Sequence, residues 1–340
     1  MRRLARCSIL GGAMTMLVAC GGGEGRGDAG GGPGIGSLGN ETGDASSGST
    51  SAASTGLGSH DGTATNDETA ASDGLTSGYH PKFDLGILPD ATIPEEGCQK
   101  VDFLFTIDNS GSMGDDQDTL VGNFPAFITG IQSVLGTVDE YQVGIVTTDT
   151  YDYNVAGCQQ LGSLVVQTGG SNSSNSTCGP YAAGYNFMTE ADDLAMEFSC
   201  AADVGTVGSA TERPMEATVQ AVQQVQGGPG QCNEGYLRED SLLVIVIITD
   251  EPGDDSGNAT TWFDDIVAAR SGIEENIAVV SLINVPGGGC PGSNANQISA
   301  FTNMFTNGFE APVCTNDYGP AFQQAIDLIE EACNNFTPPG

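Results

Sequence analysis

The sequence predicts an α/β fold, in which a doubly wound and mostly parallel sheet is flanked by helices and preceded by a disordered linker. Four short runs are almost wholly apolar and rich in residues that favour strands; they cover residues 101–107, 141–147, 241–249 and 277–283. Such runs are typical of strands that are buried on both faces of a parallel sheet. Helical patterns alternate with them and cover residues 119–135, 213–225, 261–271 and 318–333. This alternation indicates the α/β class.

An export signal is predicted at the start of the chain. A basic segment precedes an apolar stretch that is too short for a typical membrane-spanning helix. The basic residues are Arg2, Arg3 and Arg6. The stretch ends in a motif that resembles the lipobox of bacterial lipoproteins, Leu17-Val18-Ala19-Cys20. The resemblance implies a signal peptide at residues 1–19, a lipid on Cys20 and export to the bacterial envelope. The residue after Cys20 is Gly21 rather than the Asp of an inner-membrane retention signal, which favours the outer membrane or the cell surface.

A disordered linker is predicted to follow Cys20 and to run to residue 79. It is rich in Gly, Ser, Thr, Ala and Asp and has few large apolar side chains, so it cannot bury a core. Residues 80–100 contain prolines and form a lead-in segment. The domain itself is predicted at residues 101–335, with an insert at about 150–200 that is rich in Gly, Ser and Asn.

The charge of the chain is strongly negative, with 44 Asp and Glu against 9 Lys and Arg. Beyond residue 100 the only Lys or Arg residues are Arg213, Arg238 and Arg270. Such a surface repels the phosphates of nucleic acids and anionic lipids, so no nucleic acid partner is expected. Contact with a membrane is expected only through the lipid on Cys20. The charge favours divalent cations or basic partners.

The chain has 10 cysteines, and all but Cys7 and Cys20 lie between residues 98 and 333. None forms a C-x-x-C pair and the only histidines are His60 and His80, so a Cys/His zinc site is not expected. Behind an export signal, an even number of widely spaced cysteines predicts disulfides.

The disulfide partners are predicted from geometry and spacing. A final helix that runs antiparallel to the sheet ends at the edge where the first strand begins, so Cys98 and Cys333 should approach each other. Local spacing favours two further pairs and leaves a fourth. These are Cys158–Cys178, Cys290–Cys314 and Cys200–Cys232.

An oxygen-rich loop follows each of the two strongest strands. The loop after the first strand reads Asp108-Asn109-Ser110-Gly111-Ser112. The loop after residues 241–249 begins with Asp250. Ligands of doubly wound sheets bind beyond the carboxyl ends of the strands, so Asp108 and Asp250 meet if the two strands are neighbours. A few hard oxygen ligands with room for water suit Mg²⁺ best, or Mn²⁺, whereas Ca²⁺ usually takes more ligands.

The first loop and its flanks resemble a known family. The segment Phe105-Thr106-Ile107-Asp108-Asn109-Ser110-Gly111-Ser112-Met113 resembles the start of von Willebrand factor A domains, in which this loop opens a metal-ion-dependent adhesion site. The resemblance covers residues 100–335 and implies a Rossmann-like sheet. It extends to VWA-containing bacterial lipoproteins through residues 143–149, 237–240 and 249–251.

The resemblance also implies roles for individual residues. Ser110, Ser112 and one hydroxyl from a later loop would coordinate the metal directly. Asp108 and Asp250 would act directly or through water, and one position would stay open for a carboxylate of a partner. The later hydroxyl belongs to Ser209 or to Thr211. Aligning the start of the following helix favours Ser209, whereas Thr211 is the residue type that is more usual there.

The sequence favours a binding protein over an enzyme. The domain contains no His and no Lys, so Ser110 lacks the usual partners that would make it a nucleophile. No Gly-x-x-x-x-Gly-Lys run is present to bind phosphates. The leading interpretation is an adhesion module whose protein partner supplies an Asp or Glu to the metal. The alternative is a structural component of an envelope complex, in which the metal only stabilises loops.

Overall fold

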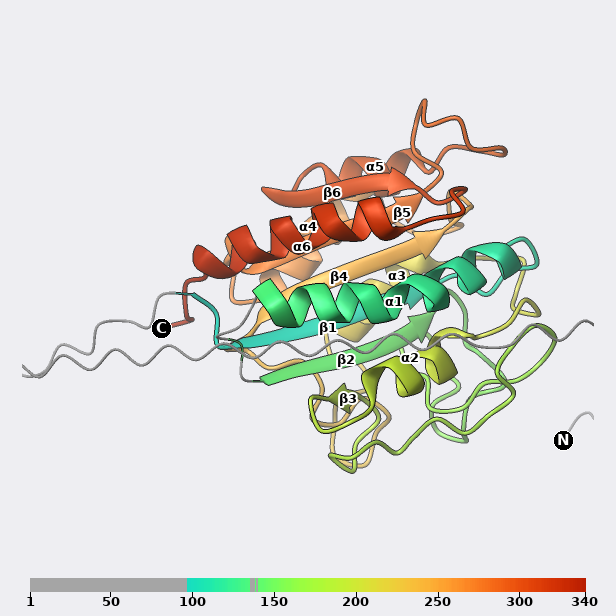
Figure 1. Cartoon of the computed structure of the whole chain (residues 1–340), viewed down its shortest axis with the longest axis horizontal. Helices are drawn as coiled ribbons and strands as arrows, with labels where there is room; N and C mark the ends of the chain where they lie inside the picture. The colour runs from blue at the N-terminus through green and yellow to red at the C-terminus, as the bar shows by residue number, and fades with distance from the viewer. Residues whose placement is uncertain (1–96, 135–137, 139) are drawn as a thin grey trace, which may run out of the picture. The chain divides into compact units, whose positions relative to one another are not determined.

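Within the described residues, strands form one sheet in the order β3-β2-β1-β4-β5-β6, and every neighbouring pair except β2 and β3 is parallel (Figure 1). The computed structural model describes residues 97–134, 138 and 140–340. The strands are β1 (Lys100–Ile107), β2 (Glu140–Thr147), β3 (Met188–Thr189), β4 (Leu242–Thr249), β5 (Ile277–Ile283) and β6 (Asn307–Pro312). The predicted signal peptide at residues 1–19, Cys20, the linker to residue 79 and most of the lead-in lie outside the described residues.

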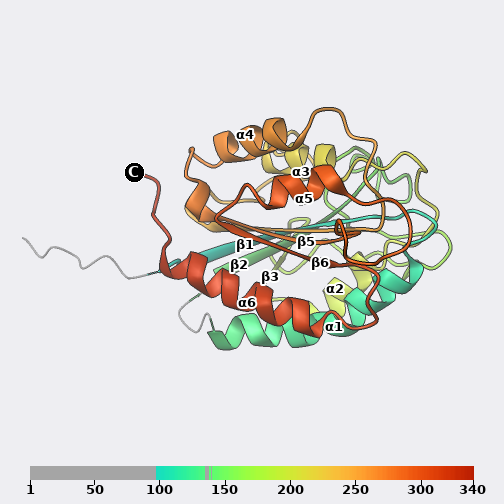
Figure 2. The same cartoon turned by 90° about the horizontal axis from the view of Figure 1, so that it is seen from above.

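Helices cover both faces of the sheet, which makes the fold doubly wound. In Figure 2, α1, α2 and α6 lie on one face and α3, α4 and α5 lie on the other. Their bounds are α1 (Gly114–Val134), α2 (Leu194–Ala202), α3 (Pro214–Val222), α4 (Ala259–Ala269), α5 (Asn296–Thr302) and α6 (Gly319–Asn334), and a 3₁₀ turn, η1, covers Glu274–Asn276. None of the helices in the described part is both long enough and apolar enough to cross a bilayer.

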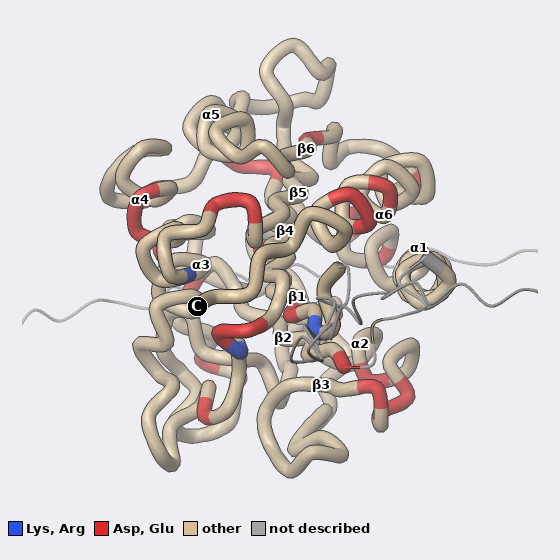
Figure 3. Tube along the Cα trace, turned by 90° about the vertical axis from the view of Figure 1, so that its left-hand side faces the viewer, with Lys and Arg blue, Asp and Glu red and all other residues tan. Residues whose placement is uncertain are grey.

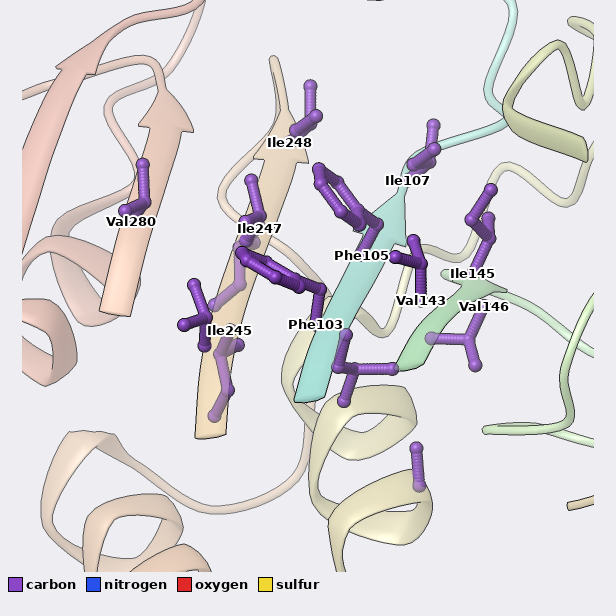
Figure 4. Close-up of a cluster of buried hydrophobic side chains, with 14 of the residues drawn as sticks. Phe103, Phe105, Ile107, Val143, Ile145, Val146, Ile245, Ile247, Ile248 and Val280 are labelled. Carbon is purple, nitrogen blue, oxygen red and sulfur yellow. The ribbon is translucent and has the colours of Figure 1, made fainter. Parts of the chain in front are cut away.

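The central strands are buried on both faces, as their apolar runs predict. Every residue of β4 and β5 is buried, and Figure 4 shows the side chains of β1, β2 and β4 packed together. Phe105 of β1 packs edge-on against Phe124 of α1 and Phe198 of α2. The next residue points to the other face, where the Thr106 hydroxyl bonds that of Thr218 in α3 at 2.7 Å. The alternation of side chains along β1 therefore joins both helical layers to one strand.

The four predicted strands are confirmed as β1, β2, β4 and β5, and the four predicted helices as α1, α3, α4 and α6. No pattern in the sequence predicted β3, α2, α5 or β6. With two residues in β3 and seven in α5, neither is long enough to produce a periodic pattern. The edge strand β6 contains Gly308 and Pro312 and is mostly half-buried, so it lacks the apolar run of a central strand.

Two disulfides agree with prediction and two do not. Cys98–Cys333 and Cys290–Cys314 form as predicted. The predicted pairs Cys158–Cys178 and Cys200–Cys232 are wrong, because the chain forms Cys158–Cys232 and Cys178–Cys200 instead.

The cause of this exchange is the path of the insert between β2 and α3. The insert folds back against the segment that follows α3, where the Asn233 side chain accepts a hydrogen bond from Leu164 N and donates one to Gly162 O. This contact places Cys158 beside Cys232, with 5.2 Å between their Cα atoms. Spacing along the sequence cannot reveal such a fold-back.

Three basic side chains, Lys100, Arg238 and Arg270, lie at the edge where the parallel strands begin. Arg238 lies 2.6 Å from Asp102, a carboxylate of β1 with no exposed surface, and the Ser241 hydroxyl donates to the same carboxylate at 2.6 Å. Arg270 donates to the backbone oxygen of Ser241 at 2.7 Å, and Lys100 pairs with Asp240 at the surface. Figure 3 faces this edge and shows blue segments beside red ones.

The buried disulfide at this edge gives a test of the fold. Replacing Cys98 and Cys333 with Ala opens a loop of 235 residues, and the chain-entropy model gives a loss of roughly 5 kcal/mol in the free energy of unfolding. Replacing Cys290 and Cys314 opens a loop of 24 residues, for which the same model gives roughly 3 kcal/mol. Urea unfolding of both variants measures the difference. Equal losses would contradict the placement of Cys98–Cys333 as the long-range closure.

Candidate metal centre

The two predicted metal-binding loops lie side by side, because β1 and β4 are neighbours in the sheet. Ile107 is opposite Ile248 in the parallel register, and Asp108 N donates to Ile248 O at 3.0 Å. From this edge β1 leads to α1 on one face and β4 leads to α4 on the other (Figure 2). The chain thus reverses its direction of winding between β1 and β4, which is where α/β sheets bind their ligands.

Asp108 is fixed by groups from three parts of the chain. Its carboxylate has no exposed surface, and it accepts hydrogen bonds from Ser110 N at 2.8 Å and from the Thr249 hydroxyl at 2.6 Å. The Gln117 side chain donates to Asp108 O and to Gly205 O, both at 2.9 Å. Gln117 therefore ties the Asp108 loop to the end of the insert. The roles of Thr249 and Gln117 were not predicted from the sequence.

A row of oxygen atoms leads from the buried Asp108 loop to the surface. The Ser110 and Ser112 hydroxyls are 3.3 Å apart, and the Ser112 hydroxyl donates to Asp250 Oδ1 at 3.1 Å. Ser110 is buried, Asp250 is half-buried and Ser112 is exposed. The structure thus brings together four of the predicted site residues, two carboxylates and two hydroxyls, within one small area.

Burial also sets the electrostatics of the loop. Removal from water is the main reason that the pKa of Asp108 is raised to about 6; the nearby Asp250 carboxylate also contributes, and the hydrogen bonds from Thr249 and Ser110 only partly offset the rise. A raised pKa means that the buried anion is costly in the folded chain. A cation bound beside Asp108 would remove that cost.

The two candidates for the later hydroxyl ligand both lie in a turn before α3. Ser209 and Thr211 are exposed, and the Ser209 hydroxyl accepts a hydrogen bond from Thr211 N at 3.0 Å. Asp149, at the end of β2, holds the turn by accepting from Ser209 N at 2.8 Å. None of the hydrogen bonds in the described part joins either hydroxyl to Asp108, Ser110, Ser112 or Asp250. The choice between Ser209 and Thr211 stays open.

The next residue, Glu212, was given no role by the sequence analysis. It is fully buried, and one carboxylate oxygen accepts a hydrogen bond from the Thr148 hydroxyl. Burial, followed by the charge of Asp108, raises the pKa of Glu212 to about 8. A charged residue between Thr211 and Arg213 would ordinarily be expected at the surface, so the sequence holds no signal for its burial.

The acidic loop after β4 is clamped onto the start of α3. Asp255 accepts from Glu216 N at 2.7 Å and so caps the helix, while the Glu216 carboxylate accepts from Ser256 N at 2.8 Å. Asp254 N donates to Glu212 O at 2.5 Å. The loop that carries Asp250 and the turn that carries Ser209 and Thr211 are therefore one connected unit.

Two cavities flank the Asp108 loop. One has a volume of about 450 Å³ and the other of about 320 Å³. The larger is lined by Asn109, Asp149, Thr150, Tyr151, Asp152, Tyr153, Val207, Gly208 and Ser209. The smaller is lined by Ser112, Asp115, Asp116, Thr119, Asp250, Cys290, Pro291, Val313, Cys314, Thr315 and Asn316. Neither lining includes a Lys or Arg, so both carry only negative charge around the loop.

The donor set fits a hard divalent cation better than a soft one. Carboxylate and hydroxyl oxygens suit Mg²⁺, Mn²⁺ or Ca²⁺, whereas the eight cysteines of the described residues all form disulfides. Across residues 97–134, 138 and 140–340, no three Asp, Glu, His or Cys side chains converge as a metal cluster. The loop has two such groups, Asp108 and Asp250, and its other oxygens are the hydroxyls of Ser110 and Ser112.

Comparisons with known proteins return distant similarities. No family model and no curated protein matches this chain. Among solved structures it is similar to proximal thread matrix protein 1 of the mussel byssus, with 12% identity, a TM-score of 0.38 and coverage of 68% of this chain and 49% of that chain. A structure of that protein with a zinc-occupied MIDAS motif gives 11% identity and a TM-score of 0.38, again over 68% of this chain and 49% of that one.

A pilus adhesin, SpaC from Lactobacillus rhamnosus GG, gives 11% identity and a TM-score of 0.35, over 69% of this chain and 31% of that chain. The chain therefore spans about half the length of the mussel protein and about a third of the adhesin. Similarity at this level does not bear on what the chain binds.

The buried position of Asp255 at the start of α3 predicts that its effect on the stability of the fold depends on pH. Burial raises the pKa of Asp255 to about 6, above the roughly 3.9 of an unfolded Asp, so the folded chain binds this proton more tightly. The contribution of Asp255 to stability therefore falls as the pH rises from about 4 to about 6. In EDTA, Asp255→Asn should raise the unfolding temperature at about pH 7.5, and the gain should vanish near pH 4.

The exposed neighbour Asp254 provides the control, because Asp254→Asn removes the same charge without removing a buried carboxylate. A gain for Asp255→Asn that persists unchanged at low pH would show that the effect does not come from the buried charge.

Proposed function

We propose that this chain is a binding or adhesion module of the von Willebrand factor A type that engages a protein partner through a divalent cation, Mg²⁺ in the first place. The observation that carries the proposal is the row of oxygens from Asp108 through Ser110 and Ser112 to Asp250 at the junction of β1 and β4. Two carboxylates and two hydroxyls would hold the ion, and an Asp or Glu of the partner would complete its shell.

The surroundings of the loop support a binding role. The two cavities beside it provide a concave surface that a partner could contact while its carboxylate reaches the ion. The exposed Ser112 and half-buried Asp250 lie where such a partner would arrive. The negative linings favour basic groups around the carboxylate of the partner.

We propose no catalytic activity for this site. Ser110 bonds Ser112, and residues 101–335 contain no His or Lys that could activate it as a nucleophile. A hydrolase would need the cation to activate a water molecule, which is a distinct reaction with a measurable turnover.

The proposed location is the bacterial envelope, with a lipid on Cys20 as the anchor and the outer membrane or cell surface as the site. The four disulfides support export to an oxidising compartment. The lipobox-like motif supports the anchor.

Removal of the cation tests the adhesion role. The full chain, immobilised in Mg²⁺, should retain an envelope protein that EDTA releases, and Asp108→Ala should retain none of it because the site loses its buried carboxylate. Calorimetric titration with Mn²⁺ should show binding to the unaltered chain and none to Asp108→Ala. Circular dichroism should show the same fold in both chains.

A different pattern supports the structural alternative. If EDTA lowers the unfolding temperature sharply, and the retained proteins are the same with Mg²⁺, with EDTA and with Asp108→Ala, the cation stabilises loops and the adhesion proposal is wrong. Metal-dependent turnover of a peptide or ester substrate would instead indicate a hydrolase.

The anchor is tested separately by Cys20→Ser. The variant should take up no fatty acid in metabolic labelling and should leave the membrane fraction, whereas Cys7→Ser should still be labelled, because Cys7 lies in the predicted signal peptide. Continued labelling of Cys20→Ser would refute lipidation at this residue.

A further inference from the structure

Glu212 is a buried acid with an unsatisfied oxygen. Its side chain has no exposed surface, Oε2 accepts a hydrogen bond from the Thr148 hydroxyl, and Oε1 has no partner among the described residues. A buried carboxylate oxygen without a donor is costly, typically by several times the net value of one hydrogen bond. Native structures contain few such atoms, and each calls for a physical reason.

The surroundings of Glu212 add negative charge. Asp108 is the carboxylate whose charge acts on it most strongly, followed by Asp149 and Glu251. Thr148, its hydrogen-bond donor, also lies 3.3 Å from the Asn109 side-chain oxygen, within the metal loop. Glu212 thus lies against the Asp108 loop from the side of α3.

The basic residues of the domain do not neutralise this acid. Arg213, the neighbour in sequence, is partly exposed and pairs with Glu216 at 3.5 Å. Arg238 and Arg270 belong to the opposite edge of the sheet, where they bond Asp102 and Ser241. Glu212 and Asp108 therefore form a pair of buried acids with which no Lys or Arg of the described residues pairs.

We propose that Glu212 is a supporting acid of the metal site, whose free oxygen Oε1 accepts a hydrogen bond from a water molecule bound to the cation rather than contacting the cation itself. This inference rests on the proposed metal binding and adds a residue to it. It explains in one step the unsatisfied oxygen, the missing counter-charge and the position beside Asp108. A divalent cation supplies what the protein lacks at this point.

The proposal also changes the expected part played by the turn before α3. Ser209 and Thr211 are exposed and bond each other, whereas Glu212 from the same turn is buried beside Asp108. The turn then contributes a carboxylate where a hydroxyl was expected. With Asp108, Asp250 and Glu212 ionised around one divalent cation, the site has a net negative charge. The cation is then held more firmly, and it attracts the carboxylate of a partner less strongly.

Mn²⁺ titration of the full chain tests the proposal. Glu212→Gln keeps the shape of the side chain and removes its charge, so Mn²⁺ affinity should fall about 10- to 100-fold, as for other residues that support metal ligands. The unfolding temperature of Glu212→Gln in EDTA should not fall, because the metal-free chain loses a buried acid whose Oε1 has no partner. Asp254→Asn is the matched control, because it removes the charge of an exposed acid; its Mn²⁺ affinity should stay within about twofold of that of the unaltered chain. Ser209→Ala and Thr211→Val should also change affinity less than Glu212→Gln.

Each alternative result is decisive. If Asp108→Ala abolishes Mn²⁺ binding but Glu212→Gln binds within twofold of the unaltered chain, Glu212 is not part of the site and the metal proposal stands without it. If the unaltered chain binds no Mn²⁺, both proposals are wrong. If Glu212→Gln fails to fold in EDTA, the carboxylate serves the fold through Thr148, which also overturns the inference.

Discussion

The parallel pairing of β1 with β4 is the constraint on which the rest of the molecule depends. It aligns Ile107 with Ile248, so Asp108 comes level with Thr249, and Asp250 follows one residue beyond the end of β4. The pairing requires both faces of the two strands to be covered, because neither strand has an exposed side. The helices of the two layers provide this cover by packing on the two faces of the central strands. The oxygen-rich loops lie at the carboxyl ends of these strands, where the covered sheet meets solvent.

The side chains around the loops keep a cluster of negative charge in a fixed arrangement. Thr249, Gln117 and the backbone of Ser110 hold Asp108, and Asp149 holds the turn before α3. Arg238 and Arg270 lie at the other edge of the sheet, where Arg238 balances Asp102, and Arg213 pairs with Glu216 at the start of α3. None of these side chains pairs with Asp108 or Asp250, which is a costly arrangement for an empty site and a favourable one for a site that holds a cation.

The sequence predicted the central architecture because its signals there are local and strong. The apolar runs of β1 and β4 and the Asp-x-Ser-x-Ser loop each lie within a few consecutive residues. Other features depend on how the insert folds back, which no local sequence pattern indicates. They are the disulfide partners of Cys158 and Cys178, the burial of Glu212 and the hydrogen bonds from the Gln117 side chain to Asp108 O and Gly205 O. The short elements β3 and α5 escaped notice because packing, rather than periodicity, defines them.

The position of Cys98 at the start of β1 has a mechanical consequence. The chain that enters the domain joins β1 directly, and β1 ends at the Asp108 loop, so a pull between the entering chain and a molecule held at that loop runs along a single central strand. β2 and β4 pair with this strand on either side, so hydrogen bonds along both of its edges hold it in the sheet. The disulfide to Cys333 shares the load with α6 before it reaches the strand. With this chain path, the domain transmits tension from the entering chain to the Asp108 loop while its core stays packed.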